Sequence, residues 1–230
     1  MTYPDFKQPI RASEPATKSG LLRAKGCFLL PAVLAWCIAA HPVAAQTSVL
    51  DDFCTGPYTK TLSSGRDDNR QPLLAPSVGP ARLTSFVLPG NPHAGLARLD
   101  LSNGHAIVDV PFQGFAGLDL SYGFSDFGVI TPLRLDLGMY RKFRINLIAN
   151  GAGYGEPLTV NILVYQHNGY VYQGAANINP SYYPLGVDID FDSFASNQRD
   201  AVRDFKDIDC IAFLFQARDS FGVQSLMAVN

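Results

Sequence analysis

Apolar and polar residues alternate with a period of two along most of the sequence after residue 80. This alternation is typical of strands that bury one face and expose the other. Clusters of Gly, Pro, Asn and Asp separate the alternating segments and indicate turns. The pattern predicts about ten strands: Arg82–Leu88, Gly95–Leu101, His105–Phe112, Leu133–Leu137, Lys142–Ala149, Leu158–Gln166, Tyr170–Ala175, Val187–Phe191, Ile208–Gln216 and Val223–Val229.

Local composition adds three expectations about how these segments are connected. Asn103-Gly104 lies between two alternating segments and predicts a hairpin turn. Residues 64–80 are rich in Gly, Pro and polar residues, so we expect a long surface loop there. Ile208–Gln216 is apolar on both faces, which predicts a strand in the centre of a sheet.

One short segment is suited to form a helix. Ser196 can cap about two turns of helix near residues 197–204. Many short strands, little helix and no alternation of strands with helices predict an all-β fold, an antiparallel β-sandwich or jelly roll. We expect residues 46–230 to form this single domain.

The first 45 residues have the pattern of an export signal. Basic residues precede the apolar run Cys27–Ala40, whose 14 residues are too few to span a bilayer as a helix. Val43-Ala44-Ala45 then supplies small residues at a cleavage site. We expect a signal peptide over residues 1–45 and a mature protein that is secreted or periplasmic. An uncleaved membrane anchor and a lipoprotein modified at Cys37 are the alternatives.

Charge and cysteine content narrow the class of partner. Residues 46–230 contain 13 Lys and Arg against 18 Asp and Glu, a net charge of −5. A mildly acidic domain argues against a nucleic-acid partner, and we expect no membrane contact after signal cleavage. Cys54 and Cys210 are the two cysteines in this part of the chain. In an exported protein they predict one disulfide, and two free buried thiols are the alternative.

Recognisable catalytic motifs are absent from the sequence. It has no Gly-x-Ser-x-Gly elbow, no His-Glu-x-x-His, no Cys-x-x-Cys and no phosphate-binding loop. Residues 46–230 contain one glutamate, Glu156, which has no evident partner for the paired carboxylates of a glycosidase. These absences favour a binding protein over an enzyme, although aspartates can fill both glycosidase roles.

Tyrosines gather around one predicted hairpin and the loop that follows it. A tyrosine offers a flat apolar face and a hydroxyl, which suits stacking against sugars, and neighbouring amides and a histidine supply hydrogen bonds. The alternative is that these tyrosines fill cross-strand pairs inside the fold. The predicted ligand-binding residues are Tyr165, His167, Asn168, Tyr170, Tyr172, Gln173, Tyr182 and Tyr183.

Asp188 and Asp190 alternate with apolar residues and are therefore expected on one face of a strand. Neighbouring carboxylates repel one another, and Ca²⁺, which prefers oxygen ligands, would relieve the repulsion. Asp51 or Asp52 would have to complete such a site. A solvated outer face and a pair of catalytic carboxylates are the alternatives, and we expect no other cofactor.

Five segments between residues 50 and 229 carry a resemblance to a known group. They are Leu50–Pro57, Leu135–Ile145, Val187–Phe191, Phe205–Ile211 and Phe221–Val229. Their order resembles the strand starts of exported bacterial β-sandwich proteins, many of which look like carbohydrate-binding-module jelly rolls. The resemblance implies a fold and, by analogy, a binding role. Gln224 stands where such modules often carry an acidic residue beside a structural Ca²⁺, so this calcium site is not implied.

Together these observations predict an exported, non-catalytic domain that binds an extracellular polymer, for which the tyrosines favour a glycan. One alternative is an extracellular polysaccharide-acting enzyme, a hydrolase or lyase, that uses aspartates such as Asp188 and Asp190. Another is a structural matrix or adhesion component.

Overall fold

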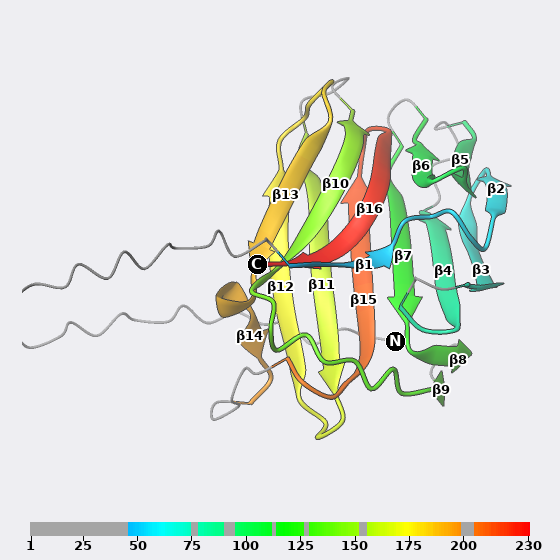
Figure 1. Ribbon diagram of the computed structural model, residues 1–230. Helices are drawn as coiled ribbons and strands as arrows, with labels where there is room; N and C mark the ends of the chain where they lie inside the picture. Colours follow the sequence, from blue (N-terminus) through cyan, green and yellow to red (C-terminus); the bar gives the residue numbers. More distant parts are fainter. Residues whose placement is uncertain are drawn as a thin grey trace, which may run out of the picture. The chain divides into compact units, whose positions relative to one another are not determined.

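The computed structural model describes residues 46–74, 78–89, 95–111, 114–126, 129–151, 156–198 and 205–230. These residues lie in one compact unit, Val43–Asn230, and their regular structure is almost entirely strand (Figure 1). The elements are β1 (Thr47–Asp51), β2 (Tyr58–Leu62), β3 (Gly65–Pro72), β4 (Ala81–Leu88), β5 (Ala97–Ser102), β6 (His105–Asp109), β7 (Ala116–Tyr122), β8 (Phe124–Asp126), β9 (Val129–Ile130), β10 (Lys142–Asn150), β11 (Leu158–Gln166), β12 (Val171–Ile178), β13 (Leu185–Asp190), a 3₁₀ turn (Phe191–Ser193), β14 (Ala195–Ser196), β15 (Ile208–Ala217) and β16 (Phe221–Val229).

Two seven-stranded antiparallel sheets pack into a sandwich. Sheet A has the order β13-β10-β16-β6-β5-β2, and β1 pairs with β16 beside this path. Sheet B has the order β14-β12-β11-β15-β7-β4-β3. A separate two-stranded ribbon joins β8 and β9. The predicted all-β antiparallel sandwich is therefore confirmed.

Several local predictions are also confirmed. Ile208–Gln216 corresponds to β15, which lies between β11 and β7 in the interior of sheet B. The hairpin turn at Asn103-Gly104 joins β5 to β6, and both residues have positive φ, 53° and 79°. Asparagine and glycine tolerate this conformation better than other residues, so the sequence selects the turn.

Other local predictions are wrong. Part of the predicted loop at residues 64–80 is β3, an edge strand whose mixed charges hide any alternation. Leu133–Leu137 is not a strand, because Arg134 has a φ of 54° and only Leu135 forms a bridge, to Ile208. The strands β1, β2 and β7 were not predicted from the sequence, although β7 alternates clearly.

Two predicted segments lie outside the described residues. Residues 1–45, the expected signal peptide, are one, and residues 199–204, most of the expected helix, are the other. Just before the segment expected to be helical, Ala195–Ser196 forms β14, which pairs with β12. Among the residues that are described, no helix is long and apolar enough to cross a membrane.

The inner faces of the two sheets share an aromatic core at one end. The Phe143 ring lies 5.7 Å from that of Phe213 and 4.8 Å from that of Phe191, measured between centroids. Phe191 stacks on Phe205 at 4.2 Å with an angle of 20° between the rings. Aromatic pairs of this kind add to the free energy gained by apolar burial, so this end of the sandwich is firmly held.

A buried charge pair joins the two sheets at another place. Arg82 on β4 donates a hydrogen bond of 2.7 Å to Asp51 Oδ2 on β1, and the Tyr122 hydroxyl donates another of 2.6 Å to the same oxygen. The Arg82 side chain also donates to Gln71 Oε1 and to the Gly56 carbonyl. A buried ion pair is tolerated only when such hydrogen bonds satisfy it, and here they do.

The prediction of a disulfide is wrong, because Cys54 and Cys210 are both free thiols. Cys54 is exposed just after β1, beside Gly104 in the β5–β6 turn. Cys210 is buried on β15, where its thiol donates to the Gly123 carbonyl at 3.2 Å. The two residues belong to different parts of the sandwich, and sequence separation gives no measure of their distance in space.

Candidate functional site

The structure distributes the predicted ligand-binding residues over three places. Tyr172 is fully buried on β12, where its ring packs 5.5 Å from that of Phe205. Tyr165 and Gln173 instead lie on the outer face of sheet B, opposite the core. Tyr172 is therefore part of the core, and a ligand can reach only its neighbours on the outer face.

His167, Asn168 and Tyr170 form the tight turn between β11 and β12. The Asn168 side chain accepts a hydrogen bond from the Tyr170 backbone N–H at 3.0 Å, and Tyr170 packs partly against the core. His167 Nδ1 lies 3.1 Å from Asp209 Oδ2. These contacts account for the three residues as parts of a well-held turn.

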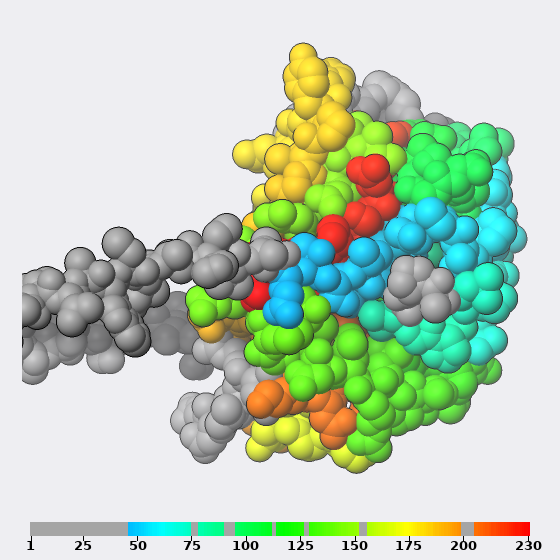
Figure 2. Space-filling model, in the orientation of Figure 1, coloured from blue at the N-terminus to red at the C-terminus, as the bar shows by residue number. Residues whose placement is uncertain are grey.

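Tyr182 and Tyr183 lie at the opposite end of β12, in the connection to β13. Their side chains are 76% and 79% exposed, and Ser181 fixes the backbone by accepting from Tyr183 N–H and donating to its carbonyl. Figure 2 shows the gold segment at the start of β13 projecting from the surface at this end. The length of β12 thus separates this pair from the β11–β12 turn.

Asp188, one of the two aspartates predicted to hold a cation, faces basic residues. Asp188 accepts two hydrogen bonds from Arg144, at 2.7 and 2.8 Å, and forms an ion pair with Lys142 at 2.7 Å. The Arg144 hydrogen bonds, followed by those of Lys142, lower the pKa of Asp188 to about 2. Among the described residues, no group of three or more His, Cys, Asp and Glu side chains is placed to hold a metal ion. The structure therefore lends no support to a Ca²⁺ site at Asp188 and Asp190.

A different set of polar residues comes together on the outer face of sheet B. Strand register places six residues in one row across six strands, with adjacent Cα atoms about 4.5–5.5 Å apart. The row is Asp68, Ser85, Asp119, Leu214, Asn161 and Ala175. We call this row and its outward neighbours on the same strands the sheet B face.

Ser85 and Asp119 are the unusual members of this row. Ser85 lies on the outer side of β4 but is only 2% exposed, and its Oγ has no hydrogen-bond partner. Asp119 is its direct partner on β7. Burial raises the pKa of Asp119 to about 6, partly offset by the positive charge of Arg66 and reinforced by Asp68. A shielded hydroxyl without a partner beside a carboxyl of raised pKa is typical of a place where a ligand binds.

Neutral hydrogen-bonding groups lie elsewhere on the same face. Thr159 donates to Asn177 at 3.0 Å, and Gln216 lies beside Thr159 on the neighbouring strand. Further along β11, Tyr165 presents its ring edge-to-face to Phe124, with centroids 6.4 Å apart. The sheet B face therefore combines amides, hydroxyls, one partly buried carboxyl and an aromatic ring held in place.

Sequence reasoning missed the centre of this face because it missed β7. Residues 118–122 read Leu-Asp-Leu-Ser-Tyr, an alternation that predicts a strand with Asp119 and Ser121 on its polar face. Ser85 was inside a predicted strand, but only the three-dimensional register brings it opposite Asp119. Burial of an outward-facing serine has no sequence signal.

Comparison with known proteins gives matches among solved structures only. No protein-family model matches the sequence, and no curated protein matches it. A structure of the family 11 carbohydrate-binding module of the cellulosomal cellulase Lic26A-Cel5E from Clostridium thermocellum is similar, with 14% identity and a TM-score of 0.38. That match covers 80% of this chain and 94% of the module.

Two further structures of such modules are similar to this chain. The Clostridium thermocellum family 11 module in complex with a β-1,3-1,4-mixed-linked tetrasaccharide matches with 16% identity and a TM-score of 0.39, over 79% of this chain and 94% of that one. The solution structure of CtCBM11 matches with 14% identity and a TM-score of 0.40, over 83% and 98%. At these identities and TM-scores, no conclusion follows about what this chain binds.

Proposed function

We propose that this chain is an exported, non-catalytic glycan-binding domain and that the sheet B face is its contact surface. The observation that carries the proposal is the buried, unpartnered Ser85 hydroxyl beside Asp119. A polar group shielded from water without a hydrogen bond is costly, and a bound polyol supplies the missing partner. Asp119 is partly exposed, so a sugar hydroxyl can donate to its carboxylate directly, whereas Ser85 Oγ is covered and can donate to the sugar only after the side chains over it move.

The other residues of the face suit the same ligand. Sugars present many hydroxyls, which amide side chains such as Asn161 and Gln173 can bind without a net charge. They also present apolar ring faces, for which the partly exposed ring of Tyr165 is suited. The row spans five strand spacings of about 4.8 Å each, roughly 24 Å, which is long enough for an oligosaccharide rather than a single ring.

Affinity electrophoresis of residues 46–230 in gels containing soluble polysaccharides tests the proposal. Mixed-linkage β-glucan, xylan, galactomannan and pectin are suitable probes. We expect at least one of them to retard the wild-type protein. Asp119→Ala and Ser85→Val should abolish or strongly reduce that retardation, because each removes the polar atoms at the centre of the row.

Asp100→Ala provides a matched control. Asp100 lies on β5 in sheet A, where it accepts a hydrogen bond from Ser102 at 2.7 Å, so the variant removes a similar carboxylate from the other sheet. Its retardation should equal that of the wild type. Equal retardation of the wild type and Asp119→Ala would contradict the placement of the site, and retardation by no polysaccharide would contradict the function.

A second candidate function has one observation in its favour. Asp119, with a pKa of about 6, and Asp68, paired with Arg66 at 2.6 Å, lie two strands apart on the same face. A carboxyl of raised pKa and a second carboxyl on one face are the components of glycoside hydrolysis. Incubation of the same polysaccharides with the protein, followed by chromatography of the products, distinguishes the two functions. Cleavage that disappears in both Asp119→Asn and Asp68→Asn would establish the enzyme.

A further inference from the structure

A pocket opens between the start of β10, the 3₁₀ turn and the residues that precede β15. Its volume is about 340 Å³, at the lower end of the range for small-molecule sites. Seven residues line it: Gly138, Tyr140, Arg141, Phe191, Asp192, Phe205 and Lys206. None of them belongs to the sheet B face, so the pocket is a separate site.

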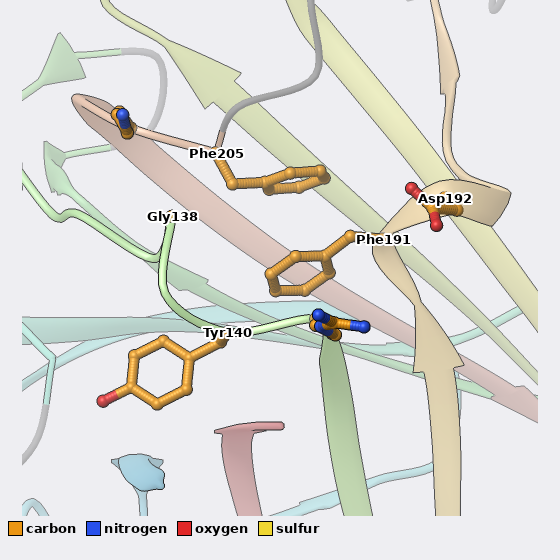
Figure 3. Close-up of a pocket in the computed structure, with 7 residues that line it drawn as sticks. Gly138, Tyr140, Phe191, Asp192 and Phe205 are labelled. Atoms are coloured by element: carbon orange, nitrogen blue, oxygen red, sulfur yellow. The ribbon is translucent and has the colours of Figure 1, made fainter. Parts of the chain in front are cut away.

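The aromatic wall of the pocket is part of the core. Figure 3 shows the Phe191 and Phe205 rings stacked, with Gly138 and Tyr140 on one side of them and Asp192 on the other. Both rings also pack against Phe143 and Phe194. Because the core holds these rings, the wall keeps its shape whether or not the pocket is occupied.

Backbone hydrogen bonds fix the polar side of the pocket. Arg141 N–H donates to the Val229 carbonyl at 3.0 Å, and the Arg141 carbonyl accepts from Phe191 N–H at 2.7 Å. On the other side of the pocket, Leu137 N–H donates to the Phe205 carbonyl at 2.9 Å. The segment that carries Tyr140 and Arg141 is therefore tied to both aromatic residues. A site held in this way loses little conformational entropy when a ligand binds.

The charges around the pocket favour an anion that also carries hydroxyl groups. Among the lining side chains Arg141 and Lys206 are positive and Asp192 is negative, and the Asp136 carboxylate lies at the edge of the pocket beside Gly138. An added Cβ at Gly138 would lie 2.9 Å from Lys206 Cε, so the Lys206 side chain runs along the wall at this glycine. A guanidinium binds a carboxylate through two parallel hydrogen bonds. Asp192 repels a compact dianion such as phosphate but accepts hydrogen bonds from hydroxyls.

We propose that this pocket binds one hexuronate ring, a six-membered polyol that carries a carboxylate, such as the terminal residue of an acidic glycan. Arg141 and Lys206 hold the carboxylate, Asp192 binds ring hydroxyls, and the apolar edge of the ring faces Phe191. The size of the cavity limits the ligand to a single ring. The site gives the domain a preference for acidic glycans that the sheet B face does not provide.

Titration of residues 46–230 with sodium D-glucuronate, followed by NMR or isothermal calorimetry, tests the proposal. D-glucose is the neutral match of the same ring, and sodium phosphate is a more highly charged anion without the ring. We expect saturable binding of glucuronate, with glucose and phosphate each at least about tenfold weaker, because each loses either the charged hydrogen bonds or the ring contacts.

Three substitutions and one control test the site. Arg141→Gln and Lys206→Gln each remove one positive charge and should weaken glucuronate binding about tenfold. Arg218→Gln is the control. It removes the same charge just after the end of β15, where Arg218 pairs with Glu156 at 3.2 Å, and it should leave glucuronate binding unchanged. Asp192→Asn should strengthen phosphate binding by removing the repulsion. These side chains are exposed, so the variants are expected to fold.

Three results would overturn the proposal: no saturable glucuronate binding, glucose binding as tightly as glucuronate, or equal loss in Arg218→Gln and Arg141→Gln. Polysaccharide retardation by the sheet B face is measured independently with neutral glucans. Loss of glucuronate binding in Arg141→Gln with unchanged glucan retardation would support both sites, and the failure of one does not imply the failure of the other.

Discussion

Asp51 and Arg82 meet between the two sheets, with their side chains fully buried and Oδ2 2.7 Å from Nη1. Asp51 comes from the first strand of sheet A and Arg82 from an inner strand of sheet B. Asp51 Oδ1 also accepts from Phe53 N–H at 2.8 Å, and the Arg82 guanidinium lies 5.3 Å from the centroid of the Phe53 ring. One charge pair thereby fixes both the N-terminal strand and the turn that follows it.

We predict that Arg82→Met destabilises the domain by about 3–5 kcal/mol, because it leaves the Asp51 carboxylate buried without its partner. Urea unfolding monitored by circular dichroism measures the change. The double variant Asp51→Leu/Arg82→Met should recover part of the loss, since both charges are then absent. As a control, Arg98→Gln breaks the exposed Arg98–Asp100 pair and should cost at most about 1 kcal/mol. Equal effects of the two single substitutions would contradict the assigned role.

The partly buried Asp119 should make stability fall as pH rises. Its pKa of about 6 exceeds the ordinary value of 3.8, so the folded protein holds a proton that the unfolded chain has released between these two values. The unfolding free energy therefore decreases as pH rises from about 4 through 6. Asp119→Asn removes this loss and should gain about 1–2 kcal/mol relative to wild type at pH 8, with little gain at pH 4. A gain that is the same at both pH values would contradict burial of the charge.

Asp188 should show the opposite pH dependence. Its pKa of about 2 lies below the ordinary value, so its ion pairs stabilise the fold above about pH 4, and this stabilisation disappears as pH falls toward 2. Because Arg144 is partly exposed, Asp188→Asn should cost only about 0.5–1 kcal/mol at pH 7. The difference between wild type and variant should also shrink in 1 M salt. Denaturation at pH 2, 4 and 7 checks the trend.

The two cysteines should differ in reactivity. Exposed Cys54 should react with a thiol reagent in the native protein, whereas Cys210 should react only after unfolding, because it is buried and its pKa is raised to about 12. Titration of residues 46–230 with Ellman's reagent, with and without denaturant, measures both. Absence of free thiol in the denatured, non-reduced protein would show that the disulfide forms after all.

The tyrosines of the hairpin region should separate into two classes. Tyr172→Ala should cost about 3–5 kcal/mol, as large aromatic truncations in cores do. Tyr182→Ala and Tyr183→Ala should change stability by less than about 0.5 kcal/mol, because these side chains project into solvent. Any loss of polysaccharide binding in the last two variants would place a second stacking surface at this end. Unfolding curves and affinity electrophoresis of the same preparations check both properties.

Part of this arrangement could be predicted from the sequence. Alternation identified most inner strands, and Asn103-Gly104 identified a hairpin, because both signals are local. Alternation also shows that Tyr172 and Gln173 point to opposite faces. It does not show which face is the core, because both residues suit either environment and only the packing of two sheets decides.

The remaining features depend on contacts between distant residues. Ser85 becomes an unpartnered buried hydroxyl only when β4 lies between β3 and β7. The sequence pattern of Asp188 and Asp190 does not record that β13 pairs with β10, which brings Arg144 opposite Asp188. In the same way, the pocket at Arg141 and Lys206 joins segments more than 60 residues apart, which no local pattern records.

The position of β16 has a consequence for the order in which the two sheets are completed during folding. The strand β16 pairs with β10, β6 and β1, and its pairing with β1 places Val229 opposite Thr47. Sheet A therefore has no continuous hydrogen-bonded interior until β16 lies between β10 and β6. Such distant pairings slow folding, so we expect sheet A to be completed later than its local hairpins.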